Sequence, residues 1–358
     1  MKRVCICLLT AALLLSLTAC GDKPAQAEIF AMDTVMDLTA YGKGGQDAVD
    51  RSQAEIQRLE ALLDRTDPDS ELSKLNAGGT AAVSSEVCRL IDAAIQYGTA
   101  TSRAFDITIA PVMDAWGFTK DSFRVPGQAE LETLLPLVDA PGRIRRGEES
   151  RESGTCALKL DSGTQVDLGG IAKGYASDQV EAIFRDCGVK SGKVSLGGNV
   201  YVQGGKPDGS PWRIGIQDPK NASGFAGILS LTDAYAITSG GYQRYFEENG
   251  TRYHHIIDPS TGYPADSGLL SVTVVASANG AAADSPAEPL PGGGAMCDAF
   301  STALFVMGEE KALDFWRSGV YDFDLVLVTE DGRVVVTGDL ANRFECSEDS
   351  GYVYETVR

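Results

Sequence analysis

The segment Asp167-Leu168-Gly169-Gly170-Ile171-Ala172-Lys173-Gly174-Tyr175 joins a predicted strand to a predicted helix near the middle of the chain. Its two adjacent glycines expose main-chain amides at the start of that helix, and Lys173 adds a cation to the same turn. Together these groups favour a phosphate site. A tight strand-to-helix turn without a ligand explains the segment about equally well, and it is neither a Walker loop nor a GxGxxG fingerprint.

A second segment, Asp298-Ala299-Phe300-Ser301-Thr302, falls on a helix predicted from Met296 to Gly308. Asp298 and Thr302 are four residues apart, so the carboxylate and the hydroxyl share one helix face. Oxygen groups of this kind suit magnesium, which takes one or two protein ligands and completes an octahedral shell with water and phosphate oxygens. The alternative is an ordinary helix in which the threonine hydroxyl bonds to its own main chain.

The only two histidines are adjacent, His254 and His255, in the segment Arg252 to Pro264. A zinc site would need further ligands, and neighbouring residues on a strand point to opposite faces. We therefore expect one histidine to face the site. A neutral imidazole there could accept a hydroxyl proton as general base, whereas the alternative is a hydrogen-bonded structural histidine.

Hydrophobic periodicity predicts an α+β fold. Helices are expected over 46–64, after Ser84, over 170–188 and over 296–308; strands over 30–38, 158–168, 212–217, 227–237 and 269–276; and a hairpin over 325–337 that turns at Asp331-Gly332. Because several strands look hairpin-connected and no linker divides the chain, we expect one two-lobed domain over 28–358, with mixed, largely antiparallel sheets and flanking helices. The glycine- and proline-rich stretch 278–294 is predicted to be a loop insertion.

The first twenty residues have the pattern of a lipoprotein signal. Lys2 and Arg3 precede an apolar run that ends in Leu17-Thr18-Ala19-Cys20. This order predicts cleavage of residues 1–19 and lipidation of Cys20, followed by a tether over 20–27; an uncleaved membrane anchor is the alternative. The expected location is the outer face of the bacterial cytoplasmic membrane, on the periplasmic side in a Gram-negative cell.

The chain is acidic, with 31 Lys and Arg against 50 Asp and Glu and a formal net charge of -19. Removal of the signal would take away Lys2 and Arg3 and leave -21. Such a charge argues against nucleic acid as a partner. The cysteines beyond residue 20 are irregularly spaced, so we expect small buried apolar residues and neither a disulfide framework nor a CxxC metal site, with one isolated bridge left open. They are Cys88, Cys156, Cys187, Cys297 and Cys346.

Taken in order, these segments resemble the ApbE family of flavin transferases from about Phe30 to Gly308. The matching positions are Ala31 to Thr34, Ser70 to Asn76, Ala104 to Thr108, Trp116 to Phe118, Asp167 to Tyr175, Gly197 to Asn199, Ile216 to Pro219, Thr238 to Gly240, the His255 segment, and Asp298 with Thr302. The chain departs from the family at Thr66, where many members have an aromatic residue near the flavin or adenine.

The resemblance implies an activity and a set of site residues. FAD would be bound by Met32, Ala104, Phe105, Asp106, Asp167, Lys173 and Ile257. Magnesium would be held by the Gly170 carbonyl, Asp298, Ser301 and Thr302, and His255 would assist the attacking hydroxyl. The implied reaction moves FMN from FAD to a threonine or serine of a partner electron-transport flavoprotein and releases AMP. Two alternatives stay open: a magnesium-dependent FAD pyrophosphatase that yields FMN and AMP, and a non-catalytic flavin-binding lipoprotein.

Overall fold

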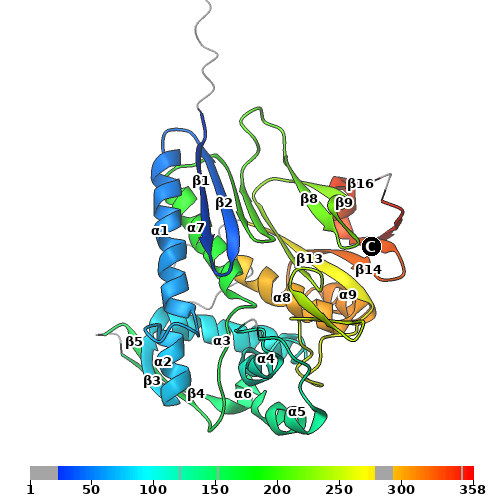
Figure 1. The fold of residues 1–358 in the computed structure, drawn as a ribbon. Helices are drawn as coiled ribbons and strands as arrows, with labels where there is room; N and C mark the ends of the chain where they lie inside the picture. The colour runs from blue at the N-terminus through cyan, green and yellow to red at the C-terminus, as the bar shows by residue number, and fades with distance from the viewer. Residues whose placement is uncertain (1–22, 121, 151–152, 279–292, 348–349) are drawn as a thin grey trace, which may run out of the picture.

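The computed structural model describes residues 23–120, 122–150, 153–278, 293–347 and 350–358. The predicted signal peptide, Cys20 and most of the predicted insertion lie outside these residues. No helix in the described ranges is long and apolar enough to cross a membrane. Figure 1 shows two lobes, one built on a large sheet and the other on short helices and a small sheet.

The largest sheet in the described part of the chain has nine strands. Its neighbours pair antiparallel, except β15 with β17, which are parallel. In spatial order the strands are β1 (Ala25–Ala31), β2 (Thr34–Tyr41), β6 (Ser191–Leu196), β7 (Asn199–Gln203), β10 (Ala234–Gly240), β13 (Leu269–Ser277), β14 (Asp324–Thr329), β15 (Arg333–Thr337) and β17 (Val353–Val357). This arrangement confirms the predicted α+β class with largely antiparallel sheets.

Both faces of the central part of the large sheet are buried, as alternating side chains of β10 show. Tyr235 and Ile237 enter the main core, which α1 (Gly45–Leu63), α7 (Ala172–Asp186) and α8 (Gly294–Met307) cover. Ala234 and Ala236 enter a second core, under the small sheet of β16 (Phe344–Cys346), β9 (Asn221–Leu231) and β8 (Trp212–Asp218). α9 (Glu309–Arg317) packs against α8 and β14.

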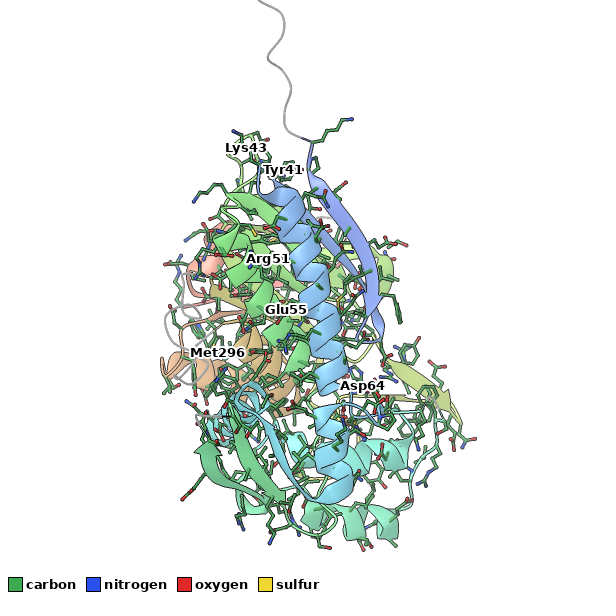
Figure 2. The ribbon with its side chains drawn as sticks, turned by 90° about the vertical axis from the view of Figure 1, so that its left-hand side faces the viewer. Tyr41, Lys43, Arg51, Glu55, Asp64 and Met296 are labelled. Atoms are coloured by element: carbon green, nitrogen blue, oxygen red, sulfur yellow. A yellow bond between two sulfur atoms is a disulfide. The ribbon has the colours of Figure 1, made fainter. Side chains whose placement is uncertain are left out.

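Helix α1 links the two lobes. Figure 2 shows it running lengthwise over the molecule, with Lys43 beside its N-terminal end and Asp64 at its C-terminal end. The second lobe contains α2 (Glu71–Gly78), α3 (Ser85–Ala100), α4 (Ala110–Trp116), α5 (Gln128–Leu134), α6 (Ala140–Arg143) and the sheet β3 (Thr80–Ser84), β5 (Thr155–Leu160), β4 (Ile144–Ser150). The hairpin of β11 (Tyr245–Glu248) and β12 (Thr251–His254) packs against α4 through an aromatic cluster.

The four predicted helices are confirmed, and each end that was predicted lies within two residues of the observed one. The Ser84 side chain accepts a hydrogen bond from the Val87 amide, which is the expected N-terminal cap of α3. α8 ends at Gly308, whose φ of 80° places it in the left-handed region that favours glycine. The helices were predictable because their apolar faces follow the 3.6-residue repeat.

The first predicted strand was wrong in its extent. Residues 30–38 belong to two strands, β1 and β2, which turn at Met32 and Asp33, both with positive φ. The two-residue turn pairs Ala31 with Thr34, so the inward-facing positions are odd-numbered in β1 and even-numbered in β2. Phe30 is 72% exposed and does not share the buried face of Met36 and Leu38. Methionine gives no turn signal, so the pattern did not reveal the reversal. Pairing of Ala25 with Ala40 also starts the folded region three residues before the predicted Glu28, inside the expected tether.

Two other predicted strands also end differently. β5 ends at Leu160 because Asp161 to Thr164 form a turn, closed by a hydrogen bond from the Thr164 amide to the Asp161 carbonyl. The predicted strand 227–237 is divided between β9 and β10, which lie in different sheets. The break falls at Asp233, whose φ is 43°. Aspartate tolerates this left-handed conformation better than most residues do.

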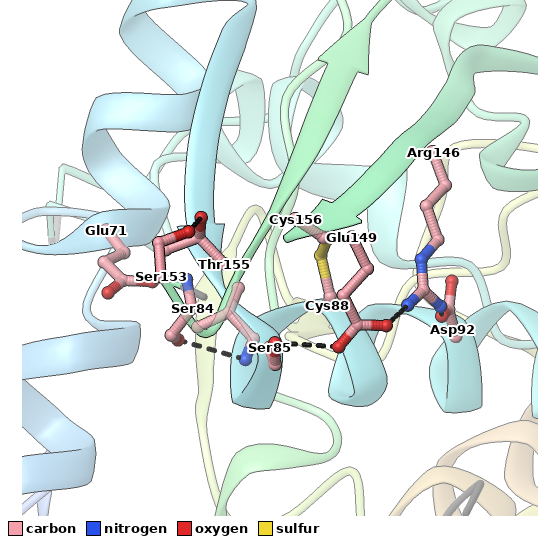
Figure 3. Close-up of a disulfide and its surroundings, with 11 residues drawn as sticks. Glu71, Ser84, Ser85, Cys88, Asp92, Arg146, Glu149, Ser153, Thr155 and Cys156 are labelled. Carbon is pink, nitrogen blue, oxygen red and sulfur yellow. Dashed lines mark hydrogen bonds and ion pairs between the residues drawn. A yellow bond between two sulfur atoms is a disulfide. The ribbon is translucent and has the colours of Figure 1, made fainter. Parts of the chain in front are cut away.

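A disulfide joins Cys88 on α3 to Cys156 on β5 (Figure 3). Their Cα atoms lie 6.5 Å apart across a sequence separation of 68 residues. Both cysteines are buried, as expected, and they form the one isolated bridge that the sequence had left open. The sequence could not name the pair, because only the packing of α3 on the small sheet brings the two together. Among the others, Cys297 is buried, Cys187 is half-buried and Cys346 is exposed.

The disulfide is expected to stabilise the second lobe. Closing a loop of this length restricts the unfolded chain, so replacing both cysteines by alanine should lower the free energy of unfolding by about 2–5 kcal/mol. Urea unfolding without reductant measures the change, and Cys346→Ser at an exposed free cysteine is the control. Equal unfolding midpoints for the double variant and the control would show that the bridge contributes nothing.

Candidate functional site

The turn that leads into α7 is held in place by neighbours from the second lobe. The Asp167 amide donates to the Ile107 carbonyl at 2.7 Å, and its carboxylate accepts from Arg65 Nε at 3.0 Å and from the Gly169 amide at 2.8 Å. Arg65 also forms an ion pair with Asp114. These contacts hold the glycine turn rigidly at the start of α7.

Phe105 packs directly on this turn. A Cβ added to Gly170 would lie 2.9 Å from the Phe105 ring, so glycine is needed there for the close approach. The carboxylate of the neighbouring Asp106 accepts from the Thr108 and Ala140 amides and from the Thr108 hydroxyl. The Asp106 side chain therefore fixes the chain around this turn. Ala104 precedes this pair and packs at the edge of the main core.

Met32 lies at the tip of the β1–β2 hairpin in a conformation unusual for methionine, with φ of 48°. The Met32 amide donates to Glu60 Oε1 of α1 at 2.7 Å. That bond fixes the turn against the helix. A non-glycine residue kept at positive φ by a specific partner is a feature often found at ligand sites.

Asp298 on α8 faces the first turn of α7. Its Oδ2 accepts from the Gly174 amide at 2.8 Å, while Oδ1 has no hydrogen bond to any described residue. Only 4% of Asp298 is exposed. The structure thus joins the two segments that the sequence singled out, one from each of two adjacent helices.

The two hydroxyls that follow Asp298 differ in surroundings. Ser301 is fully buried; its hydroxyl donates to the Asp298 carbonyl at 2.9 Å and lies 2.7 Å from the hydroxyl of Ser239 on β10. Thr302 is only half-buried and contacts the same Ser239 hydroxyl at 3.2 Å. Of the two, Thr302 has the more accessible oxygen on the Asp298 face of the helix.

The two histidines have different hydrogen bonds. His254 uses both ring nitrogens within the protein, Nε2 with the Ala265 carbonyl and Nδ1 with the Ile256 amide. Among the described residues His255 has a partner only at Nδ1, which lies 3.1 Å from the Arg244 carbonyl oxygen. A carbonyl can only accept, so Nδ1 carries the hydrogen and Nε2 keeps its lone pair. His255 is therefore the histidine able to act as a base.

Burial, and after it the positive charge of Lys173, lowers the pKa of His255 to about 4, against the opposing effect of its bond to the Arg244 carbonyl. The imidazole is thus neutral at pH 7. The half-buried Lys173 ammonium has no hydrogen bond or ion pair to any residue in the described ranges, so it is available to an anionic ligand.

The family model of the ApbE family matches residues 32–323. The chain belongs to the ApbE family. This confirms the resemblance inferred from the ordered motifs. The ApbE match includes Met32, the α7 turn, both histidines and the α8 segment, so every candidate FAD and metal residue lies inside it.

The relatives of this ApbE chain share one enzyme name, and a solved structure of the family shares its fold. It is 33% identical to the FAD:protein FMN transferase of Klebsiella pneumoniae (strain 342), over 83% of this chain and 86% of that protein. It is 29% identical to the FAD:protein FMN transferase of Haemophilus influenzae, over 93% and 96% of the two chains. The crystal structure of the ApbE protein from Thermotoga maritima has a TM-score of 0.74 at 30% identity, covering 91% of this chain and 97% of that one. The names of these relatives confirm the predicted enzyme class, a transferase.

The remaining predicted FAD residue of the ApbE chain, Ile257, is mostly buried. It packs in the aromatic cluster with Trp116 and Phe118, and it bridges to Pro264. Thr66, the departure from the family, hydrogen-bonds to Asp64 through both its amide and its hydroxyl. The structure therefore gives Thr66 a local role in the turn after α1.

Oxygen atoms at the α7–α8 junction fit a hard cation. The Gly170 carbonyl accepts no main-chain hydrogen bond from a described residue, because the Gly174 amide bonds to Asp298 instead. The unpartnered Oδ1 of Asp298 and the Thr302 hydroxyl complete a set of oxygens of the kind that magnesium prefers. Nowhere in the described ranges do three His, Cys, Asp or Glu side chains gather as a metal cluster.

Sequence reasoning missed several residues that hold this site together. Arg65 binds Asp167 from 102 residues away, and Glu60 fixes Met32 from 28 residues away, so neither pairing leaves a local signal. Ser239 lay within a matching motif but had no assigned role. Asp178 was also missed. It follows Gly174 by four residues, as Asp298 follows Gly294, and this shared spacing was the one signal in the sequence that pointed to it.

Proposed function

We propose that this chain is a magnesium-dependent FAD:protein FMN transferase. It cleaves the pyrophosphate of FAD, attaches FMN to a threonine or serine hydroxyl of a partner flavoprotein through a phosphodiester, and releases AMP. The proposal draws on the names of the relatives and on the local chemistry. The observation that carries it is a combination among the described residues: Lys173 has no ion pair, Asp298 has one carboxylate oxygen without a hydrogen bond, and His255 is neutral, with its pKa lowered in part by the Lys173 charge.

The charges suit a pyrophosphate. The first turn of α7 carries the positive end of the helix dipole, and the Lys173 ammonium lies in the same turn. In a chain with a formal net charge of -19, this local cation gives an anionic substrate a favourable place to bind. The flavin and adenosine groups would lie against the residues around the turn, including Met32, Phe105 and Asp167.

His255 supplies the base. The acceptor hydroxyl gives its proton to His255 Nε2 while its oxygen bonds to the phosphorus on the FMN side of FAD. The bond from that phosphorus to the bridging oxygen breaks, and AMP departs with the oxygen and its electron pair. The bond from Nδ1 to the Arg244 carbonyl holds the ring in the tautomer that this transfer requires.

A bound magnesium ion supplies charge neutralisation to the pyrophosphate and the leaving phosphate. The protein groups that would hold it are the Gly170 carbonyl, Asp298 Oδ1 and the Thr302 hydroxyl. Ser301 is the fourth predicted ligand, and its buried hydroxyl also bonds to the Asp298 carbonyl and the Ser239 hydroxyl.

The test combines the purified chain, FAD and magnesium with solubilised membranes of the producing organism, taken from cells that lack this chain. Flavin fluorescence on a protein band after denaturing electrophoresis supports transfer. Free FMN and AMP with no labelled band would make the chain a pyrophosphatase. Intact FAD after the incubation would make it a flavin-binding protein without catalysis.

The proposed location is the outer face of the cytoplasmic membrane, with Cys20 as the lipid anchor. The leader pattern supports it, and so does the Cys88–Cys156 bridge, since disulfides persist mainly in oxidising compartments. Labelling of cells with radioactive palmitate should mark the wild-type chain and leave Cys20→Ser unmarked. An unlabelled wild-type chain would refute the anchor.

A further inference from the structure

Helices α7 and α8 cross at a pair of glycines. A Cβ on Gly174 would lie 2.2 Å from the Gly294 carbonyl oxygen, and a Cβ on Gly294 would lie 2.4 Å from the Gly174 carbonyl oxygen. Both glycines are thus required by the close approach of the two backbones. The crossing lies within the first turn of each helix, so the two N-terminal ends meet there.

An aspartate follows each of these glycines by four residues, one helical turn. Each aspartate accepts hydrogen bonds from the N-terminus of the opposite helix. Asp298 Oδ2 accepts from the Gly174 amide at 2.8 Å. Asp178 Oδ1 accepts from the Gly294 amide at 2.5 Å, and its Oδ2 accepts from the Ala295 amide at 2.9 Å. The two helices therefore cap one another.

Neither helix has a cap of its own. The residues at the N-cap positions, Ile171 for α7 and Gly293 for α8, make no side-chain cap hydrogen bond. The first amides of a helix have no partner within the helix and need an acceptor when buried. For α8 that acceptor is Asp178, and a carboxylate there also interacts favourably with the helix dipole.

We propose that Asp178 is a positioning residue of the flavin-transfer site. Its carboxylate holds the first turn of α8 against α7, and so keeps Asp298 and Thr302 aligned with the turn that carries Lys173. This inference rests on the proposed function for its effect on catalysis. The structural part of the inference, that Asp178 fixes the start of α8, rests only on the hydrogen bonds.

Burial makes the charged form of the Asp178 carboxyl energetically unfavourable. It is 4% exposed, and burial raises its pKa to about 7, although the amides of Ala295 and Gly294 and the Tyr235 hydroxyl favour the charged form. Other titratable groups interact with it electrostatically: Glu181 and Tyr175 from the same helix, Tyr97 from α3, Tyr201 from β7 and Cys297 from α8. Burying an ionisable group costs free energy unless hydrogen bonds compensate for the loss of water. The presence of Asp178 here therefore indicates that its hydrogen bonds to α8 matter.

Asp178→Asn tests the inference, because an amide side chain has one acceptor oxygen where the carboxylate has two. One of the two α8 amides then faces an NH₂ group. Glu181→Gln is the matched control: Glu181 lies on the same helix, is 3% exposed and accepts from Tyr235, but makes no hydrogen bond to α8 in the described part of the chain. We expect Asp178→Asn to raise the magnesium concentration for half-maximal transfer by about tenfold, as for a lost supporting group at a metal site, with the control unchanged.

Amide hydrogen exchange at the start of α8 gives a readout independent of activity. In the wild-type protein without FAD or metal, the Gly294 and Ala295 amides should exchange slowly, unlike the first amides of an uncapped helix. This needs no variant, so it holds even if Asp178→Asn folds poorly. Faster exchange in Asp178→Asn than in Glu181→Gln supports the inference. Fast exchange in the wild type, or the same magnesium requirement in both variants, overturns it. A wild-type chain that transfers no flavin yet exchanges slowly would refute the proposed function and leave the cap intact.

Discussion

Asp298→Ala is expected to lower FMN transfer by more than about 100-fold, since loss of a group that merely supports a metal ligand already costs 10–100-fold. The carboxylate is the only charged group among the proposed magnesium ligands, and its Oδ1 has no other partner among the described residues. Removing it leaves the substrate's negative charge opposed mainly by Lys173. Initial rates over a range of magnesium concentrations measure the effect.

The alanine change also removes the acceptor of the Gly174 amide, which costs about 1–3 kcal/mol of stability when a buried donor is left without a partner. Asp298→Asn separates the two roles. Its amide oxygen can still accept from Gly174, so the melting temperature should stay near that of the wild type while transfer is lost. Full transfer by the asparagine variant would remove Asp298 from the proposed metal site.

His255→Ala is expected to lower kcat for transfer by about 10²–10⁴-fold, the usual contribution of a general base, with a much smaller change in KM for FAD. His255→Asn is the matched variant, because its side-chain NH₂ can donate to the Arg244 carbonyl as Nδ1 does, yet it has no basic nitrogen. Equal loss in both variants supports proton transfer. Recovery in the asparagine variant would show that His255 only shapes the loop.

The pH dependence follows from the same residue. Since the pKa of His255 is lowered to about 4 in the folded protein from 6.5 in the unfolded chain, the unfolded state takes up a proton first as the pH falls. This group's contribution to stability is complete above pH 6.5 and is lost as the pH falls towards 4. His255→Asn should remove that part of the acid destabilisation. A wild-type kcat/KM profile with a break near 6.5 assigned to His255 would contradict the lowered pKa.

The helices and the chemically reactive segments could be predicted because each is encoded locally. The apolar repeat of α1, the Ser84 cap and the glycine that ends α8 are all set by neighbouring residues. The β1–β2 turn could not be predicted, since Met32 adopts its left-handed conformation only with the help of Glu60 from α1.

The supporting residues of the site escaped prediction for a similar reason. Arg65 is one of many surface-type cations in the sequence, and only the packing of α1 near α4 makes it the partner of Asp167 and Asp114. The choice between His254 and His255 likewise needed the structure, because it depends on which ring nitrogens meet carbonyls and amides of distant residues. The Cys88–Cys156 bridge depends on contact between α3 and β5.

A crystal structure with FAD and magnesium tests the central claim most directly. The account predicts the pyrophosphate at the start of α7 beside Lys173, and a metal ion about 2.1 Å from Asp298 Oδ1 and from the Gly170 carbonyl oxygen. His255 Nε2 should face the phosphorus on the FMN side. Phosphates bound away from the α7–α8 junction, or a metal ion with no bond to Asp298, would contradict it.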